Sequence, residues 1–234
     1  MTQPQEQEDS GELAGPERAS IDRTYQRDWP KYFEAVSGKP PRDTVLFALQ
    51  RFAEEGVKER WAIDIACGEG RDTRAILQSG PWTVLAVDGH AEAVERTKAQ
   101  IPPQYRNRCI VRQAVMELLP AETEHAGMID LVNASFALPF CDPQGFPALW
   151  AWIRQMLKPG GRFAGQFFGE RDDWYNIRPG SHMTQDQLID LFDGFVMEHL
   201  DEVEKDGDDA MGGIKHHHVF HVVARLSGAS VPNI

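Results

Sequence analysis

The residues best suited to bind a cofactor lie between positions 63 and 73, where the chain reads Ile-Asp-Ile-Ala-Cys-Gly-Glu-Gly-Arg-Asp-Thr. Small residues at the point where a strand turns into a helix let a ligand approach the backbone without meeting a Cβ atom. Asp88 ends the next apolar run, where its carboxylate can accept hydrogen bonds from both hydroxyls of a ribose. The combination predicts a site for a nucleoside-type cofactor.

The glycine spacing in this segment distinguishes between classes of cofactor. Dinucleotide sites use a G-x-G-x-x-G pattern whose third glycine lies at the start of the helix beside the pyrophosphate. Gly68 and Gly70 match the first two positions, and Thr73 stands at the third. We therefore expect a cofactor without phosphates, which disfavours an NAD-dependent enzyme. Taken alone, the segment is equally compatible with a tight turn that packs a helix on a strand, and Asp88 favours the cofactor site.

The elements around this segment alternate between short apolar runs and amphipathic stretches, which is typical of βαβ units in a parallel sheet. The predicted strands span residues 61–66, 83–87, 109–112, 128–133, 162–168, a run beginning at 195 and reaching 203, and 219–226. The predicted helices span residues 42–55, 73–78, 91–101 and 142–157, and another follows the capping box of Thr184 and Gln187. The acidic segment 204–213 is predicted to join the last two strands as a hairpin at the sheet edge.

Residues 25–226 resemble the class I S-adenosylmethionine-dependent methyltransferases, in particular small single-domain members similar to the tellurite-resistance and thiopurine-type enzymes. The motifs that carry this resemblance are the acid and glycine-rich turn from Asp64 to Gly70, the acid Asp88, a polar stretch after the fourth strand, and Leu-Lys-Pro-Gly-Gly at 157–161. The resemblance implies an α/β fold, a Rossmann-like, doubly wound sheet of seven strands. It implies a mostly parallel sheet with the last strand antiparallel and helices on both faces.

The resemblance also implies roles for individual residues in binding S-adenosylmethionine. Asp64 would face the methionine amino group and Asp88 would hold the ribose hydroxyls. Many relatives place an acid after the third strand to bind the adenine amino group; Val115 stands there, so a backbone carbonyl or Glu117 would serve instead. The cofactor-binding residues implied in this way are Asp64, Ala66, Cys67, Gly68, Gly70, Asp88, Gly89, Val115, Met116 and Asn133.

Methyl transfer from a sulfonium is an in-line displacement of an activated group, so alignment of the reactants and exclusion of water suffice and no catalytic residue is predicted. Aromatic faces near the sulfonium contribute about 0.5–2 kcal/mol each by cation–π attraction. The apolar run 133–142 lies at the carboxyl end of a central strand, where open α/β sheets bind ligands. Substrate-pocket residues are predicted to be Tyr32, Ser135, Phe136, Phe140, Phe168 and Trp174. For each aromatic residue, simple core packing is the competing interpretation.

Several other residues invite a functional interpretation with a structural alternative. Arg42 and Arg71 can pair with the carboxylate of the cofactor or with Asp72. The histidines at 216–218 invite a metal site, but strand alternation puts consecutive rings on opposite faces, so no metal is predicted. We expect an edge strand there, with one histidine of this region near the mouth of the site. Cys67 and Cys141 are expected to be buried thiols.

Composition limits the class of protein and its partners. A net charge of −12 disfavours nucleic acid, and the three cysteines form no metal or disulfide pattern, which fits a cytoplasmic protein. No apolar run is long enough to span a membrane. We expect a disordered acidic tail at 1–20, a single domain at 21–228 with a helical cap at about 25–40, and a C-terminal tail at 229–234. The expected activity is methylation of a small molecule by a monomer or homodimer; a non-catalytic cofactor-binding regulatory or partner module is the alternative.

Overall fold

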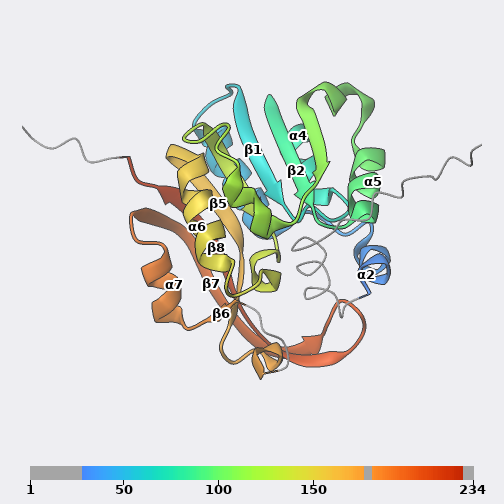
Figure 1. The fold of residues 1–234 in the computed structure, drawn as a ribbon, viewed down its shortest axis with the longest axis vertical. Helices are drawn as coiled ribbons and strands as arrows, with labels where there is room; N and C mark the ends of the chain where they lie inside the picture. The colour runs from blue at the N-terminus through green and yellow to red at the C-terminus, as the bar shows by residue number, and fades with distance from the viewer. Residues whose placement is uncertain (1–27, 177–180, 229–234) are drawn as a thin grey trace, which may run out of the picture.

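A computed structural model describes residues 28–176 and 181–228, and its centre is a single twisted sheet (Figure 1). The strands are ordered β3-β2-β1-β4-β5-β8-β7, and the short β6 pairs with β5. Their bounds are β1 Arg60–Ile65, β2 Trp82–Asp88, β3 Cys109–Gln113, β4 Ile129–Ala134, β5 Leu157–Gly169, β6 His182–Met183, β7 Phe195–Asp208 and β8 Ile214–Leu226. The predicted tails, 1–20 and 229–234, and residues 25–27 of the predicted cap lie outside the described residues.

The direction of the strands confirms the predicted fold class. β1 pairs in parallel with β2 and β4, and further parallel pairs join β2 to β3 and β4 to β5. β8 is antiparallel to both of its neighbours, β5 and β7. The sheet is therefore mostly parallel with the last strand of the chain antiparallel, and the two-residue β6 is the one addition to the seven predicted strands.

Helices cover both faces of the sheet, as predicted. The α-helices are α2 Trp29–Val36, α3 Asp43–Glu54, α4 Arg71–Gln78, α5 Ala91–Gln100, α6 Phe146–Met156 and α7 Gln185–Leu191, and the 3₁₀ helices are η1 Pro103–Arg108, η2 Met116–Ala121, η3 Leu138–Phe140 and η4 Asp173–Asn176. One apolar core joins α3 and α4 to sheet residues such as Ala62 and Val84, and the other joins α6 and α7 to residues such as Ile63 and Phe163. Neighbouring strand residues thus enter opposite cores, as strand alternation requires. Among the described residues, every helix is too short or too polar to cross a lipid bilayer.

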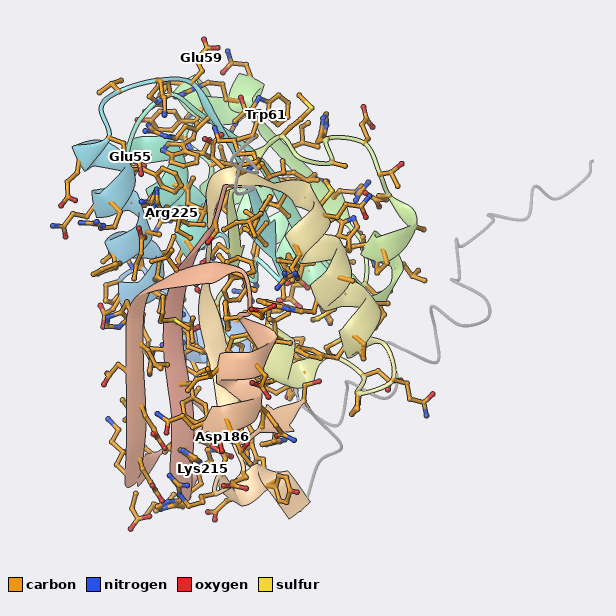
Figure 2. The ribbon with its side chains drawn as sticks, turned by 90° about the vertical axis from the view of Figure 1, so that its left-hand side faces the viewer. Glu55, Glu59, Trp61, Asp186, Lys215 and Arg225 are labelled. Carbon is orange, nitrogen blue, oxygen red and sulfur yellow. The ribbon has the colours of Figure 1, made fainter. Side chains whose placement is uncertain are left out.

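The β7–β8 hairpin is longer than predicted. The segment 204–213 was expected to be a connecting loop, but Glu204 to Asp208 pair with His218 to Ile214, and the turn is confined to 209–213. The reason is the composition of the partner strand: Glu204 lies opposite His218 and Asp206 lies opposite His216, and such acid–histidine pairs stabilise adjacent strands. In Figure 2 the hairpin runs along one side of the molecule, with Arg225 toward one end and Lys215 toward the other.

The helix that precedes β5 also differs from its predicted start. It was expected to begin at Asp142, but α6 begins at Phe146. Asp142 makes a turn instead, in which its side chain accepts a hydrogen bond from the backbone of Gln144 and its carbonyl accepts one from Gly145. Asp side chains favour such turns over helix interiors. The capping box of Thr184 and Gln187 begins α7 as predicted.

Candidate functional site

The turns after β1 and β4 meet at the carboxyl edge of the sheet, because these strands are neighbours. Each turn contains a non-glycine residue in the left-handed region, Ala66 with φ 52° and Phe136 with φ 51°. Such conformations cost about 1–3 kcal/mol and persist where the surrounding structure enforces them, typically at functional sites. Gly68 and Gly70 are also left-handed, and Gly70 is the N-cap of α4. Strained backbone therefore surrounds the edge of the sheet where the cofactor site was predicted.

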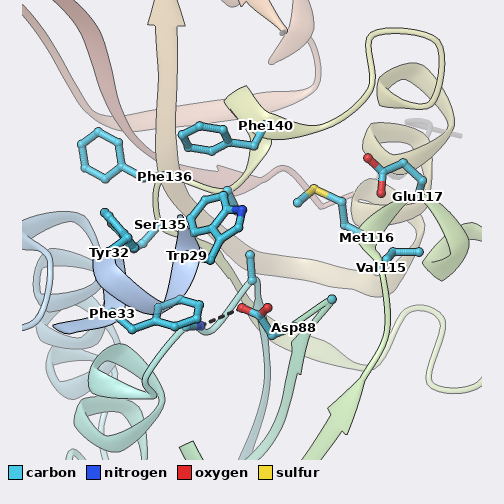
Figure 3. Close-up of a pocket in the computed structure, with 14 residues that line it drawn as sticks. Trp29, Tyr32, Phe33, Asp88, Val115, Met116, Glu117, Ser135, Phe136 and Phe140 are labelled. Carbon is cyan, nitrogen blue, oxygen red and sulfur yellow. Dashed lines mark hydrogen bonds between the residues drawn. The ribbon is translucent and has the colours of Figure 1, made fainter. Parts of the chain in front are cut away.

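An inner pocket opens at this edge, and Asp88 lies at its base (Figure 3). Its lining residues are Trp29, Tyr32, Phe33, Ala66, Gly68, Asp88, Gly89, Val115, Met116, Glu117, Ser135, Phe136, Ala137 and Phe140. The Asp88 carboxylate accepts hydrogen bonds from the backbone N–H of Gly68 at 2.9 Å and of His90 at 2.8 Å. Burial raises the pKa of Asp88, and these two bonds oppose the rise. Each oxygen of the Asp88 carboxylate keeps a free lone pair, so the carboxylate can accept one further hydrogen bond at each oxygen, as two ribose hydroxyls require.

The far wall of the inner pocket comes from the segment after β3. A Cβ atom on Gly89 would lie 3.1 Å from Val115 Cγ1, so the glycine allows β2 and this segment to approach closely. Val115 and Met116 provide apolar surface suited to a flat base. Glu117 lines the pocket as well, while its Oε1 accepts a hydrogen bond from the Asp142 N–H at 3.0 Å. An acid is therefore present beside the position where Val115 replaces the usual one.

A side pocket lies beside the inner pocket, under the glycine-rich turn. It is lined by Tyr32, Phe33, Val36, Asp64, Ala66, Cys67, Gly68, Glu69, Arg71, Asp72 and Ser135. Asp64 is 1% exposed and accepts hydrogen bonds from Thr73 Oγ1 and from Asn133 Nδ2, the latter at 2.8 Å. Burial and then the neighbouring Asp72 raise the pKa of Asp64 to about 7. A cation in this pocket would stabilise the ionised form of both acids, which suits the amino group of a methionine moiety.

Three of the predicted cofactor-binding residues have side-chain surroundings that differ from those of the others: Asn133, Gly70 and Cys67. Asn133 is fully buried and lines none of the pockets described; its amide holds Asp64. Gly70 shapes the start of α4 and lies too close to Thr97 for a Cβ atom. Cys67 lines the side pocket, but its thiol is buried against Thr97, and burial raises its pKa well above the usual value. Cys141 is also a buried thiol, as expected.

Aromatic residues of α2 cover the inner pocket. Trp29 meets Phe140 edge-on at 5.4 Å between ring centroids, and Phe33 meets His90 edge-on at 5.7 Å. Figure 3 shows Trp29 projecting between Phe140 and Asp88. The cap begins with Asp28, whose side chain accepts a hydrogen bond from the Lys31 N–H, and a proline at the first turn favours the helix. The described part of the predicted cap therefore lies over the cofactor-binding edge of the sheet.

An outer groove of about 830 Å³ continues from the inner pocket along the hairpin, within the range of about 300–1,000 Å³ usual for ligand pockets. Tyr32, Phe136 and Phe140 line both spaces. The ring centroid of Phe168 lies 5.9 Å from that of Phe140 and 5.6 Å from that of Trp174, so the groove has a continuous aromatic wall. All the predicted substrate-pocket residues except Ser135, which lines the inner and side pockets, line this groove.

The histidines of β8 are divided between two faces of the hairpin, as strand alternation predicted. His217 and His221 line the outer groove, and burial lowers the pKa of His221. His218 lies on the other face with Glu202 and Glu204, and one ligand atom from each lies within 4.8 Å of the others. The Arg171 guanidinium donates to both glutamates at 2.8 Å and so supplies a cation to this cluster.

Gln166 is a site residue that the sequence analysis missed. It is fully buried in β5, where its Oε1 accepts a hydrogen bond from the Phe136 N–H at 2.9 Å and its amide donates to Thr44 Oγ1 at 2.9 Å. It thereby holds the strained turn at Phe136 against α3. The sequence could have indicated this residue, because Gln166 is the single amide in the apolar run Phe-Ala-Gly-Gln-Phe-Phe. A polar side chain buried in such a strand requires hydrogen-bond partners.

The sheet order defines an open α/β protein, a class that binds its ligands at the carboxyl ends of the strands, and the glycine-rich turn and Asp88 lie at that edge. A family model described as a methyltransferase domain matches residues 62–161. An uncharacterized methyltransferase from Synechocystis is 33% identical over 102 residues, 44% of each chain, and a carboxy-S-adenosyl-L-methionine synthase from Stutzerimonas stutzeri is 32% identical over 108 residues, 42% of this chain and 41% of the relative. The matched stretches thus span less than half of each curated relative.

Solved structures extend the similarity of fold to most of the chain. The 1,6-didemethyltoxoflavin-N1-methyltransferase of Burkholderia thailandensis, solved with its substrate and S-adenosylhomocysteine, aligns over 93% of this chain and 92% of its own, with a TM-score of 0.63 and 20% identity. TehB from Haemophilus influenzae aligns over 76% of this chain and 61% of its own, with a TM-score of 0.59 and 13% identity. The domain match and the curated relatives support a methyltransferase of class I, the class whose cofactor is S-adenosylmethionine, and the solved structures support the fold. The narrower likeness to tellurite-resistance and thiopurine-type enzymes stays a prediction.

Proposed function

We propose that the protein transfers a methyl group from S-adenosylmethionine to a small molecule. The observation that carries this proposal is the shared aromatic boundary: Tyr32, Phe136 and Phe140 line both the inner pocket, which contains Asp88, and the outer groove. A cofactor in the first space and an acceptor in the second would meet at that boundary. The bound cofactor supplies the activated methyl group.

The protein's own residues would align the reactants and exclude water. Asp88 would hold the ribose, Val115 and Met116 would contact the base, and Asp64 would interact with the amino group from the side pocket. The α2 aromatics would cover the cofactor, which removes competing water from the reacting centre. Restriction of both partners to one geometry contributes the larger part of such a rate enhancement, so a catalytic base is not required.

The acceptor is proposed to be a small molecule because the groove volume of about 830 Å³ is that of a small-molecule pocket and the net charge of −12 repels nucleic acid. The three cysteines are free, which supports action in the reducing cytoplasm.

The monomer or homodimer expected from the sequence remains part of the proposal. A purely regulatory module is not favoured, since Glu117 lies beside Val115 in the inner pocket.

Isothermal titration with S-adenosylmethionine and S-adenosylhomocysteine tests the cofactor site. We expect binding by the full chain and a loss of about tenfold to a hundredfold in Asp88→Asn, because hydrogen bonds to a carboxylate are worth about 1.5–3 kcal/mol. Asp190→Asn, an exposed acid on α7, is the matched control and is expected to bind like the wild type. An absence of heat at millimolar cofactor would refute the proposal. Cofactor binding without turnover over a broad pool of metabolites would favour the regulatory alternative.

A further inference from the structure

Two arginines lie near the boundary between the cofactor pockets and the outer groove, and they face different spaces. Arg71 lines the side pocket together with Asp64, and its side chain is 11% exposed. Arg42 lines the outer groove, one residue before α3 begins. A methionine carboxylate in the side pocket would therefore have Arg71 as its nearer partner, which leaves Arg42 for a second anion.

The guanidinium of Arg42 is held in place by two aromatic side chains. Its central carbon lies 4.4 Å from the centroid of the Phe136 ring, and it is hydrogen-bonded to the Tyr32 side chain. Among the described residues, its buried Nε has no hydrogen-bond partner and no carboxylate forms an ion pair with the guanidinium; the neighbouring acid, Asp72, is paired with Arg71 at 3.8 Å. Burial, and then the charge of Arg71, lower the pKa of Arg42, and they outweigh the opposing effects of Tyr32 and of the Asp72 carboxylate. An anion that binds this partly buried charge would offset the cost of its desolvation.

The other charges of the groove are already paired or exposed. The Lys215 ammonium is bonded to buried Asp172 and lies 4.0 Å from the Trp174 ring centroid. The acids Asp43 and Asp201 are exposed, so water screens their repulsion of an anion. An incoming anion would consequently find its strongest partner at Arg42, at the end of the groove nearest the inner pocket. The wall beside it is aromatic, because the rings of Phe136 and Phe140 both contact the ring of Phe168.

We propose that the methyl acceptor is a small aromatic carboxylic acid, bound with its carboxylate on Arg42 and its ring against this aromatic wall. The inference rests on the proposed methyltransferase function. The planar guanidinium offers two parallel donors that match a carboxylate. One unpaired guanidinium balances one negative charge, which suits a carboxylate better than a doubly charged phosphate.

The experiment compares a charged probe with its neutral isostere on full-length protein saturated with S-adenosylhomocysteine. ¹⁹F NMR titration measures the affinities of 4-fluorobenzoate and 4-fluorobenzamide. We expect the wild type to prefer the benzoate by about tenfold or more, because charge-assisted pairs are roughly twice as strong as neutral ones. Arg42→Met should lose this preference and Arg42→Lys should keep part of it. An equal affinity for both probes in the wild type, or an undiminished preference in Arg42→Met, would overturn the proposal.

A second titration identifies which anion Arg42 binds. S-adenosylhomocysteine carries the methionine carboxylate and 5′-methylthioadenosine lacks it. We expect Arg42→Met to bind both nucleosides like the wild type, and Arg71→Met to lose affinity for S-adenosylhomocysteine alone. A selective loss of S-adenosylhomocysteine in Arg42→Met would assign Arg42 to the cofactor and overturn the proposal. If the wild type binds neither nucleoside, the proposed function fails instead. If Arg42→Met does not fold, the wild-type comparison of benzoate with benzamide decides.

Discussion

At the residue scale, the buried acid Asp64 makes the cofactor site a source of instability in the free protein. Its side chain is 1% exposed and its hydrogen bonds come from Thr73 and Asn133, neither of which carries a positive charge. The nearest acid, Asp72, adds repulsion. Functional sites often combine groups that would be more stable apart, because the ligand completes their environment. The bound cofactor's amino group would do this for Asp64.

The first prediction follows from the pKa of Asp64, which lies near 7 in the folded protein against 3.8 as its ordinary value. The folded state therefore holds this proton more tightly than the unfolded state, so the contribution of Asp64 to folding stability declines as pH rises from about 4 to 7. Asp64→Asn removes that decline. We expect the variant to gain stability relative to the wild type between pH 5 and pH 8, by on the order of a few kcal/mol.

Urea denaturation of both proteins at pH 5 and pH 8 measures this effect, since the other titrating groups cancel in the comparison. Asp190→Asn is again the control, because Asp190 is exposed. An Asp64→Asn advantage that stays the same at both pH values would show that Asp64 does not titrate in this range.

At the scale of elements, the hairpin depends on a glycine at the end of the strand beside it. A Cβ atom on Gly169 would lie 2.0 Å from His218 Nδ1, and this ring in turn accepts a hydrogen bond from the Arg171 N–H at 3.1 Å. The end of β5 and the outer part of β8 can approach only because the side chain is absent. Arg171 then joins the hairpin to the segment after β5 through Glu202 and Glu204. This junction positions one wall of the outer groove.

The second prediction is that Gly169→Ala destabilises the protein by roughly 1–3 kcal/mol, because the added methyl group must displace a packed imidazole ring. Gly207→Ala is the matched control: it lies on the same hairpin, and a Cβ atom there would meet nothing within 4 Å. Urea midpoints of the two variants provide the comparison. Equal midpoints for both variants and the wild type would mean that the junction is not packed as described.

At the scale of the whole molecule, the ligand sites are assembled from parts distant in the chain. The inner pocket combines α2, the turn after β1, the end of β2, the segment after β3 and the turn after β4. A ligand that binds across these parts links them to one another. Cofactor binding is consequently expected to stabilise the domain as a unit.

The third prediction quantifies this linkage. S-adenosylhomocysteine at about 100 times its Kd should stabilise the folded state by about 2.7 kcal/mol, which raises the Tm of a domain of this size by roughly 5–10 °C. Differential scanning fluorimetry over a series of concentrations checks the dependence on ligand, with Asp88→Asn as the variant that needs more ligand for the same rise. A Tm that does not change with concentration contradicts the linkage.

The sequence alone was sufficient for the features that depend on local pattern. Alternation of apolar runs predicted the parallel sheet, and the small residues from Ala66 to Gly70 predicted a turn between strand and helix. The two-residue period of a strand predicted that the histidines of β8 would lie on opposite faces. Each of these signals lies within a few residues of chain, where backbone geometry repeats with a fixed period. The length of the hairpin was missed, because it depends on pairing between acids and basic residues on opposite strands.

The tertiary structure decided which residues share a space. Arg42 and Arg71 looked equivalent in sequence, but they line different pockets, and the Arg42 guanidinium has no ion-pair partner among the described residues. Gln166 supports Phe136 from 30 residues away, and Thr44 lies 122 residues from Gln166. Contacts of this kind arise only when the whole sheet forms and packs. The separation of two residues along the sequence does not indicate whether they will meet in the fold. The glycine-rich turn could therefore be predicted from the sequence, whereas the surroundings of Arg42 were decided by the fold.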